Sequence, residues 1–247
     1  AGYQLSKFFQ AEYDSDPSMD DETKRQVRAA AINALLKQAK ARARKVILGV
    51  PGQSVFTRCR ELPPVPEYKV NQIVKYEIQQ QIPFGLDQIA MDYQVLDRTA
   101  AGGYDVMMAA IKVDVVEKHL VLLRDVKCSI DTVDVCPIAA YNWMKRSGEF
   151  GTQGECIAII DMGAATTNIV IERENQFRFT RPLNLGGNDV TQALAEAYNV
   201  SFKEAEQLKR TRAFAPTGDP DRDKGRGATA SGDALKRLTT EAQPPFA

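Results

Sequence analysis

The sequence predicts an α/β fold in which helices and strands alternate along the chain. Short runs rich in valine and isoleucine, such as 46–50 and 156–160, have the length and composition of strands. Longer segments with polar faces, such as 20–41 and 68–81, have the length of helices. With 247 residues, the chain is long enough to bury a full hydrophobic core.

Charge and composition argue against several classes of function. Lysine plus arginine equals aspartate plus glutamate at 32 each, so charge alone points neither to nucleic acid nor to a membrane surface. No uncharged apolar run approaches the roughly 20 residues of a membrane span, and the first residues lack a signal-peptide pattern. We therefore expect a cytoplasmic protein.

The cysteine and histidine content argues against a metal site. The only histidine is His119, and it lies in a charged helical segment, where a solvated role is favoured over catalysis. The cysteines are far apart, form no C-x-x-C pair and are interpreted as small apolar side chains in a reducing compartment: Cys59, Cys128, Cys136 and Cys156.

The first third of the chain begins with a loosely alternating strand predicted at 3–13. Asp20, Asp21 and Glu22 then supply the negative charge that favours a helix start, and this helix is expected to run to about Ala41. The strand at 46–50 is closed by Pro51-Gly52.

An inserted ferredoxin-like α+β subdomain is predicted over 53–135, because its elements follow the order β-α-β-β-α-β. These elements are a strand at 54–59, a helix at 68–81, strands at 89–96 and 104–111, a helix at 115–124 and a strand at 129–135.

A second lobe is predicted after a return helix at 137–145 and a glycine-rich linker. The unbroken apolarity of 156–160 predicts a strand buried on both faces. A hairpin with arms at 167–173 and 177–185, turning at 174–176, and helices at 190–198 and 202–210 follow. Beyond 211, glycine, proline and charge predict a flexible tail or loop.

The most informative local motif is Asp161-Met162-Gly163-Ala164-Ala165-Thr166-Thr167-Asn168, where the apolar strand ends and the hairpin begins. Small residues at such a turn let backbone N–H groups approach a polyphosphate, and a carboxylate at the strand end can hold Mg²⁺ through water. The alternative is an ordinary β-turn in which the aspartate bonds to its own backbone.

Two further motifs follow along the chain. Gly186-Gly187 precedes a helix whose free N–H groups suit an anion or a close contact, and the alternative is a simple cap by Asn188 or Asp189. Glu206 and Lys209 lie three residues apart on one helical face and can bracket ribose hydroxyls. Their alternative is a surface ion pair.

In this order and spacing, the three motifs resemble the second phosphate-binding segment of the actin, Hsp70 and sugar-kinase superfamily. Within it, residues 1 to about 210 are most similar to the PilM family, with the FtsA family second. The segments that carry the resemblance are 49–55, 76–84 (with its Glu77-x-x-x-x-Ile82-Pro83-Phe84 run), 92–96, 160–168 and 186–187.

The resemblance implies an actin-like (ribonuclease H-like) two-lobed fold that binds ATP and Mg²⁺. It places Asp161 at the metal through water and assigns Glu206 and Lys209 to the ribose. It assigns the remaining nucleotide contacts to the small residues of the two turns: Gly163, Ala164, Ala165, Thr166, Thr167, Gly186 and Gly187.

The resemblance further implies a cytoplasmic scaffold of type IV pilus assembly, peripheral at the inner membrane. Its expected partner is the N-terminal peptide of a PilN-like membrane protein, docked in a groove lined by Ile73, Tyr76, Ile82 and Phe84. The alternative is that these apolar residues form the helix's core face. Trp143 is likewise expected in the core.

The resemblance also divides the chain into expected parts: 1–52 in the first lobe, 53–135 inserted, 136–154 as return helix and linker, 155–210 in the second lobe, and 211–247 as the tail. The family's first Asp-x-Gly loop and its glycine-rich adenosine segment are not found, so we expect a fold that is incomplete at both ends. Two other functions stay open: an ATPase or phosphotransferase of the same fold, which needs a γ-phosphate-directed carboxylate or glutamine, and a nucleotide-free scaffold resembling GspL.

Overall fold

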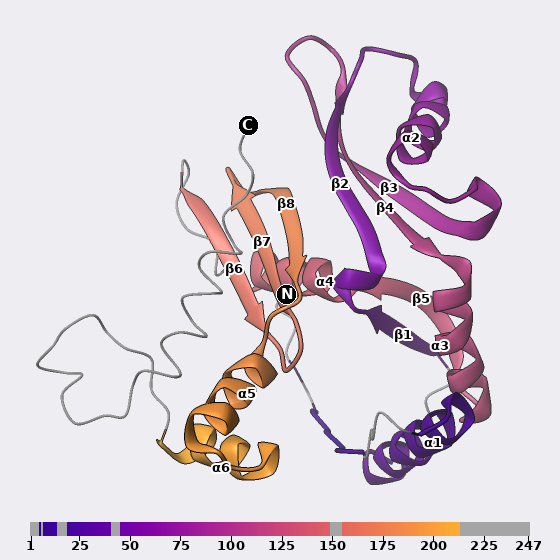
Figure 1. Ribbon diagram of the computed structural model, residues 1–247. Helices are drawn as coiled ribbons and strands as arrows, with labels where there is room; N and C mark the ends of the chain where they lie inside the picture. The colour runs from indigo at the N-terminus through magenta and orange to yellow at the C-terminus, as the bar shows by residue number, and fades with distance from the viewer. Residues whose placement is uncertain (1–4, 6, 14–18, 41–44, 149–154, 213–247) are drawn as a thin grey trace, which may run out of the picture. The chain divides into compact units, whose positions relative to one another are not determined.

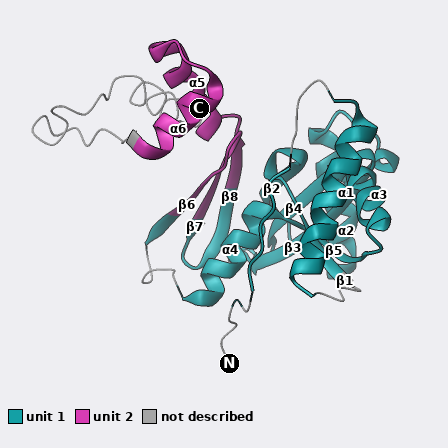
Figure 2. Cartoon of the chain, turned by 90° about the horizontal axis from the view of Figure 1, so that it is seen from below, with its two compact units in different colours: residues 1–157, 172–179 teal, residues 158–171, 180–247 magenta. Residues whose placement is uncertain are grey.

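The computed structural model describes residues 5, 7–13, 19–40, 45–148 and 155–212. The chain forms two compact units, coloured separately in Figure 2. Unit 1 contains 1–157 together with 172–179, and unit 2 contains 158–171 together with 180–247. The flexible tail predicted for 211–247 lies outside the described residues except for 211 and 212, which belong to helix α6.

Unit 1 begins, among its described elements, with helix α1 (Asp21–Gln38), which the side chain of Asp20 caps by accepting a hydrogen bond from the Thr23 N–H at 2.8 Å. Strand β1 (Lys45–Val50) follows, as predicted. The predicted strand at 3–13 is wrong for the described residues 5 and 7–13, which have no regular secondary structure. A strand needs a hydrogen-bonding partner, and apolar alternation alone does not supply one.

An antiparallel sheet forms the next layer of unit 1, in the order β2-β4-β3. Its strands are β2 (Val55–Leu62), β3 (Ile89–Arg98) and β4 (Tyr104–Lys112), with the short 3-10 helices η1 (Gly52–Ser54) and η2 (Leu86–Gln88) at its margins. Helix α2 (Glu67–Gln81) lies along one face (Figure 1). It buries Val70, Val74 and Ile78 against Val106 and Met108 of the central strand. This packing forms the main described core of unit 1.

Strand β5 (Ser129–Val135) does not join this sheet, although the element order agrees with the predicted one. It pairs in parallel with β1, after helix α3 (Val113–Asp125). The sheet therefore contains three of the four strands expected in the insertion, and the fourth pairs with β1 in a separate two-stranded sheet. Helix α4 (Cys136–Ser147) follows and ends at Gly148, whose φ of 81° is the left-handed conformation that favours glycine.

The last sheet has the order β6-β7-β8, with β6 (Cys156–Met162), β7 (Thr167–Arg173) and β8 (Gln176–Leu183). Glu174 and Asn175 form the turn between β7 and β8 with φ of 57° and 60°, so this hairpin has a two-residue loop, and Gln176 already belongs to β8. Helices α5 (Gly187–Tyr198) and α6 (Phe202–Arg212) follow.

Several expectations about burial are wrong. Strand β6 is not buried on both faces. Its first side chains alternate between exposed and partly buried, and Ile160 is 63% exposed. The reason is that β6 is an edge strand with one described neighbour. Trp143 is half exposed on α4. Of the four free cysteines, Cys128 is buried and Cys59 is partly buried, whereas Cys136 and Cys156 are exposed. Among the described residues, no helix has the length and apolarity that crossing a membrane requires.

Candidate functional site

The turn between β6 and β7 forms a compact loop of small residues. The Gly163 N–H donates to the Thr166 carbonyl at 2.8 Å and closes the turn. Ala164 and Ala165 are exposed, and within the described chain their N–H groups and that of Thr166 donate no backbone hydrogen bond. Unpaired amides beside small side chains can accept the oxygens of an anion.

The start of α5 holds this loop from the other side. The Gly187 N–H donates to the Gly163 carbonyl at 2.9 Å, and the Asn188 N–H donates to the Ala164 carbonyl at 2.7 Å. A Cβ added at Gly186 would lie 2.7 Å from both of these carbonyl oxygens. The glycine pair therefore permits a close backbone contact, which is one of the two roles considered for it.

Asp189, and not Asn188, contributes to the cap of α5, so the alternative considered for this turn holds in part. Gly186 is itself the N-cap residue of α5. The Asp189 carboxylate reaches back and accepts a hydrogen bond from the Gly186 N–H at 2.7 Å. This bond fixes the backbone where it touches the loop.

Asp161 lies exposed near the end of β6, beside a buried amide. The Asn168 side chain donates to the Asp161 Oδ2 at 3.3 Å, while the buried Asn168 Oδ1 has no partner within the described structure. A carboxylate next to an unpartnered buried oxygen fits a hydrated cation or a ligand donor. By contrast, the buried Thr167 hydroxyl donates to the Leu185 carbonyl at 2.7 Å, so it connects the end of the loop to the segment before α5.

Glu206 and Lys209 form an ion pair on α6, as the alternative interpretation of their spacing stated. Their charged atoms are 2.6 Å apart, and both contact Thr191 of α5. Hydrogen bonds from Lys209 and then Thr191 lower the pKa of Glu206 to about 2. Thr191 is fully buried and was missed by the sequence reasoning. Its spacing of four residues from Gly187 on one helix is the signal that identifies it.

The residues predicted to line a partner groove differ in burial. Ile73, Ile82 and Phe84 pack against the core cluster beneath α2, as the alternative interpretation stated. Phe84 also lies under the Lys112 ammonium, which is 3.9 Å from the ring centroid. Only Tyr76 is well exposed, at 61%.

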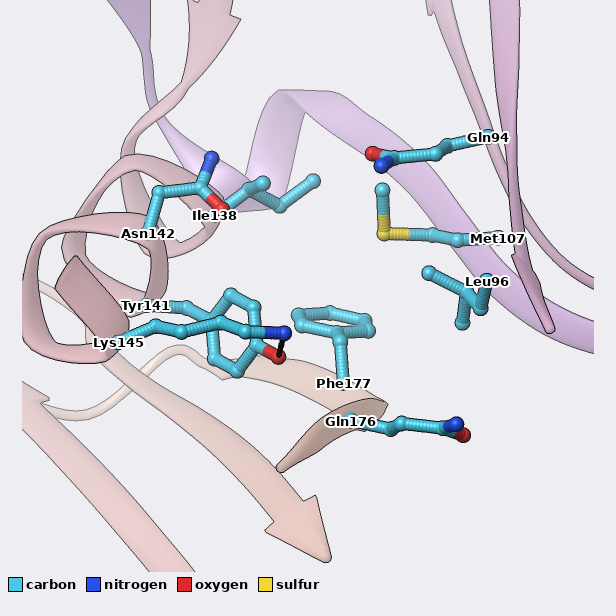
Figure 3. Close-up of a pocket in the computed structure, with 9 residues that line it drawn as sticks. All are labelled: Gln94, Leu96, Met107, Ile138, Tyr141, Asn142, Lys145, Gln176 and Phe177. Carbon is cyan, nitrogen blue, oxygen red and sulfur yellow. Dashed lines mark hydrogen bonds between the residues drawn. The ribbon is translucent and has the colours of Figure 1, made fainter. Parts of the chain in front are cut away.

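A pocket of about 130 Å³ lies within unit 1, beside strands β3 and β4 (Figure 3). Helix α4 and the start of β8 complete its wall. Its lining residues are Gln94, Leu96, Met107, Ile138, Tyr141, Asn142, Lys145, Gln176 and Phe177. Because these residues come from three distant parts of the sequence, no local motif predicts the pocket.

Specific contacts fix the hairpin end that forms part of this pocket. The Tyr141 and Phe177 rings meet edge to face with centroids 5.3 Å apart, and Lys145 donates to the Asn175 carbonyl at 2.8 Å. The Gln176 amide donates to Asp97 at 2.7 Å, and its buried Oε1 has no described partner. A buried acceptor without a partner suits a ligand that carries an N–H or O–H donor.

The chemistry that these sites support is binding. The loop of 163–166 presents free amides, Asp161 presents an exposed carboxylate, and Glu206 stays ionised. Within the described chain no group of three metal-ligating side chains occurs. His119 is half-buried on α3 of unit 1, and burial, aided by Arg28, lowers its pKa.

Comparisons with known proteins agree on the family. The family model described as type IV pilus assembly protein PilM matches residues 1–219. The solved structure of a PilM-PilN type IV pilus biogenesis complex matches with a TM-score of 0.73 at 26% identity, covering 92% of this chain and 66% of that one. The cell division protein FtsA of Bacillus subtilis (strain 168) is 28% identical over 123 residues, which are 49% of this chain and 27% of FtsA.

The chain therefore spans about two thirds of the solved PilM chain and about a quarter of FtsA. The cytoplasmic domain of EpsL, a type II secretion component of Vibrio cholerae, matches with a TM-score of 0.45 at 12% identity. A similarity of that size carries no argument about this chain.

Proposed function

Because this chain belongs to the PilM family of type IV pilus assembly proteins, we propose that it is an ATP-binding scaffold of pilus assembly. We place it in the cytoplasm, peripheral to the inner membrane and attached there through a membrane-protein partner. The actin-like fold supports this proposal, and the geometry of unit 2 supports a nucleotide site there.

One observation carries the nucleotide proposal: backbone bonds to α5 hold the loop of 163–166, while the amides of Ala164, Ala165 and Thr166 stay open. In this proposal, Gly163, Ala164, Ala165 and Thr166 meet the phosphates, and Gly186 with Gly187 keeps the loop in place. A bound Mg²⁺ would supply charge neutralisation of the phosphates, and Asp161 would orient its water ligands. Thr167 supports the loop through Leu185, and Glu206 meets the ribose.

Calorimetric titration with ATP tests this proposal. Binding should be measurable with Mg²⁺ and should weaken at least tenfold when EDTA removes the metal, since the triphosphate charge is then uncompensated. Equal affinity with and without Mg²⁺ would contradict the assigned role of Asp161. Absence of binding under both conditions would favour a nucleotide-free scaffold.

We further propose that a PilN-like partner docks its N-terminal peptide on unit 1. The solved PilM match is a complex with PilN, and the pocket of Figure 3 offers a suitable surface. Met107 and Phe177 give it an apolar wall for one anchor side chain. The Gln176 Oε1 offers an acceptor for a peptide N–H. The exposed Tyr76 on α2 marks the alternative surface.

Peptide binding to two charge variants distinguishes the surfaces. Leu96→Asp places a carboxylate in the pocket wall, whereas Tyr76→Asp places one on the outer face of α2. Fluorescence anisotropy with a labelled N-terminal peptide of a PilN-like protein should show at least tenfold weaker binding for Leu96→Asp, because an anchor pocket loses its apolar wall. Thermal unfolding confirms that both variants fold. If Tyr76→Asp alone weakens binding, the α2 surface is the docking site.

A further inference from the structure

We propose that Thr191 is a positioning residue of the nucleotide site, which holds the Glu206 carboxylate toward the hydroxyls of a bound ribose. The inference rests on the nucleotide binding proposed above. It adds Thr191 to that site and gives Glu206 and Lys209 different roles. Lys209 ties α6 to the start of α5, and Glu206 alone of the pair meets the sugar.

The buried hydroxyl of Thr191 lies at the centre of a partly buried polar cluster in unit 2. It is 2.5 Å from the Glu206 Oε2, 2.7 Å from the Lys209 Nζ and 2.9 Å from the Gly187 carbonyl. A hydroxyl has one proton, and it accepts from the ammonium. The shortest contact identifies the Glu206 carboxylate as the group to which it donates.

The donors of Lys209 are already used within the protein. An ammonium has three hydrogens, and the Lys209 Nζ has three acceptors within bonding distance. They are the Gly187 carbonyl at 2.9 Å, the Thr191 hydroxyl at 2.7 Å and the Glu206 Oε2 at 2.6 Å. No N–H of Lys209 is left for a sugar unless one of these bonds breaks.

Glu206 keeps accepting capacity on its other oxygen. The Oε1 receives one hydrogen bond from the Arg210 Nε at 2.9 Å, and a carboxylate oxygen accepts more than one. With its pKa lowered to about 2 by Lys209 first and Thr191 second, the carboxylate is ionised at neutral pH and acts only as an acceptor. Such a group selects ligands that bring hydroxyl donors, and a ribose does so.

The same cluster connects the sugar site to the phosphate loop. Lys209 bonds to the Gly187 carbonyl, and the Gly187 N–H bonds to the Gly163 carbonyl. Thr191 therefore supports a continuous path of hydrogen bonds within unit 2, from Glu206 to the loop. Satisfied buried networks of this kind fix side chains in one arrangement.

Three variants and two measurements test the proposal. Thr191→Val removes the hydroxyl at nearly constant volume, and Thr191→Ser retains it. Thr180→Val is the matched control, because the buried Thr180 hydroxyl has no described partner. Affinity is measured by calorimetry for Mg-ATP and for Mg-2′,3′-dideoxy-ATP, using the full chain. The carboxyl pKa of Glu206 is measured by NMR without nucleotide.

Wild type, Thr191→Ser and Thr180→Val should prefer ATP over the dideoxy nucleotide, and Thr191→Val should lose about tenfold of that preference. The pKa of Glu206 should rise from about 2 toward its ordinary value in Thr191→Val alone. An unchanged preference together with an unchanged Glu206 pKa overturns the proposal.

Two further outcomes are also decisive. If wild type binds no nucleotide, the proposed function fails, and the Glu206 titration still decides whether Thr191 positions the carboxylate. If Thr191→Val does not fold, Thr191→Ala, which cannot overfill the site, is measured in its place. Retained ribose preference in that variant, with the Glu206 pKa still near 2, overturns the proposal.

Discussion

Gly186→Ala should disconnect the phosphate loop from α5. The new Cβ would lie 2.7 Å from the carbonyl oxygens of Gly163 and Ala164, and both atoms belong to the backbone, which cannot rotate away. The φ of Gly186 is −159°, an extended value that any residue adopts, so the effect comes from the clash alone.

The structure sets the expected size of the effect. The added Cβ would have to move about 0.7 Å away from the two carbonyl oxygens to reach ordinary van der Waals contact. A shift of that size would stretch the hydrogen bonds that the Gly187 and Asn188 amides donate, now 2.9 and 2.7 Å long, toward the limit of hydrogen bonding. Two weakened backbone bonds cost about 1 kcal/mol each, and alanine returns about 0.4–1 kcal/mol through the unfolded state. The net loss should be about 1–2 kcal/mol of unfolding free energy.

Urea unfolding of the full chain measures this loss, with Gly187→Ala as the control. The Cβ of that neighbour would come no closer than 3.4 Å, to the Lys209 Nζ, and would lie 3.7 Å from the Gly163 carbonyl oxygen, so the stability of this variant should stay within about 0.5 kcal/mol of wild type. Hydrogen exchange should show faster exchange of the Gly187 and Asn188 amides in Gly186→Ala. Equal stability of the two variants, with both amides still protected, would refute the close contact as the reason for glycine.

Two further predictions concern unit 1. Arg178→Met should lower the unfolding free energy measured in urea by about 1–2 kcal/mol, because it leaves the largely buried Asp105 without its partner at 2.7 Å. The control Arg173→Met removes an exposed pair at 3.9 Å and should cost less than about 0.5 kcal/mol. Equal losses in the two variants would contradict the prediction for Arg178. Burial raises the pKa of the Cys59 thiol to about 12, so this thiol should react slowly at pH 8. A thiol reagent added to the folded protein should therefore label the exposed Cys136 and Cys156 first, as measured by mass spectrometry. Labelling of Cys59 at the same rate would contradict its burial.

Local signals account for the parts of the fold that sequence could predict. Helix α2 and strands β3 and β4 lie where periodicity and turn residues placed them, because those signals act over a few neighbouring residues. The position of the candidate loop was also predictable, because glycine and alanine after an apolar strand favour a tight turn of small residues. Glu206 and Lys209 were paired correctly because three residues separate neighbours on one helical face.

The remaining features depend on contacts between distant segments. The pairing of β5 with β1 cannot be read from the apolar pattern of either strand, because a ferredoxin-like sheet has the same element order. The apolar run of β6 indicates a strand but not how many neighbours it has. Thr191 gains its side-chain contacts from α6, and Gln176 gains its hydrogen bond to Asp97 of β3, so the motifs found in the sequence assigned a role to neither.

Binding of Mg-ATP to Asp161→Ala tests the central claim most directly. Asp92→Ala is the matched control, since it removes one exposed carboxylate and the same charge from unit 1. If the loop after β6 is a nucleotide site, calorimetry should show at least tenfold weaker binding for Asp161→Ala and unchanged binding for Asp92→Ala, because only Asp161 orients the hydrated cation. Wild-type affinity in Asp161→Ala would contradict the assignment of this loop to the nucleotide.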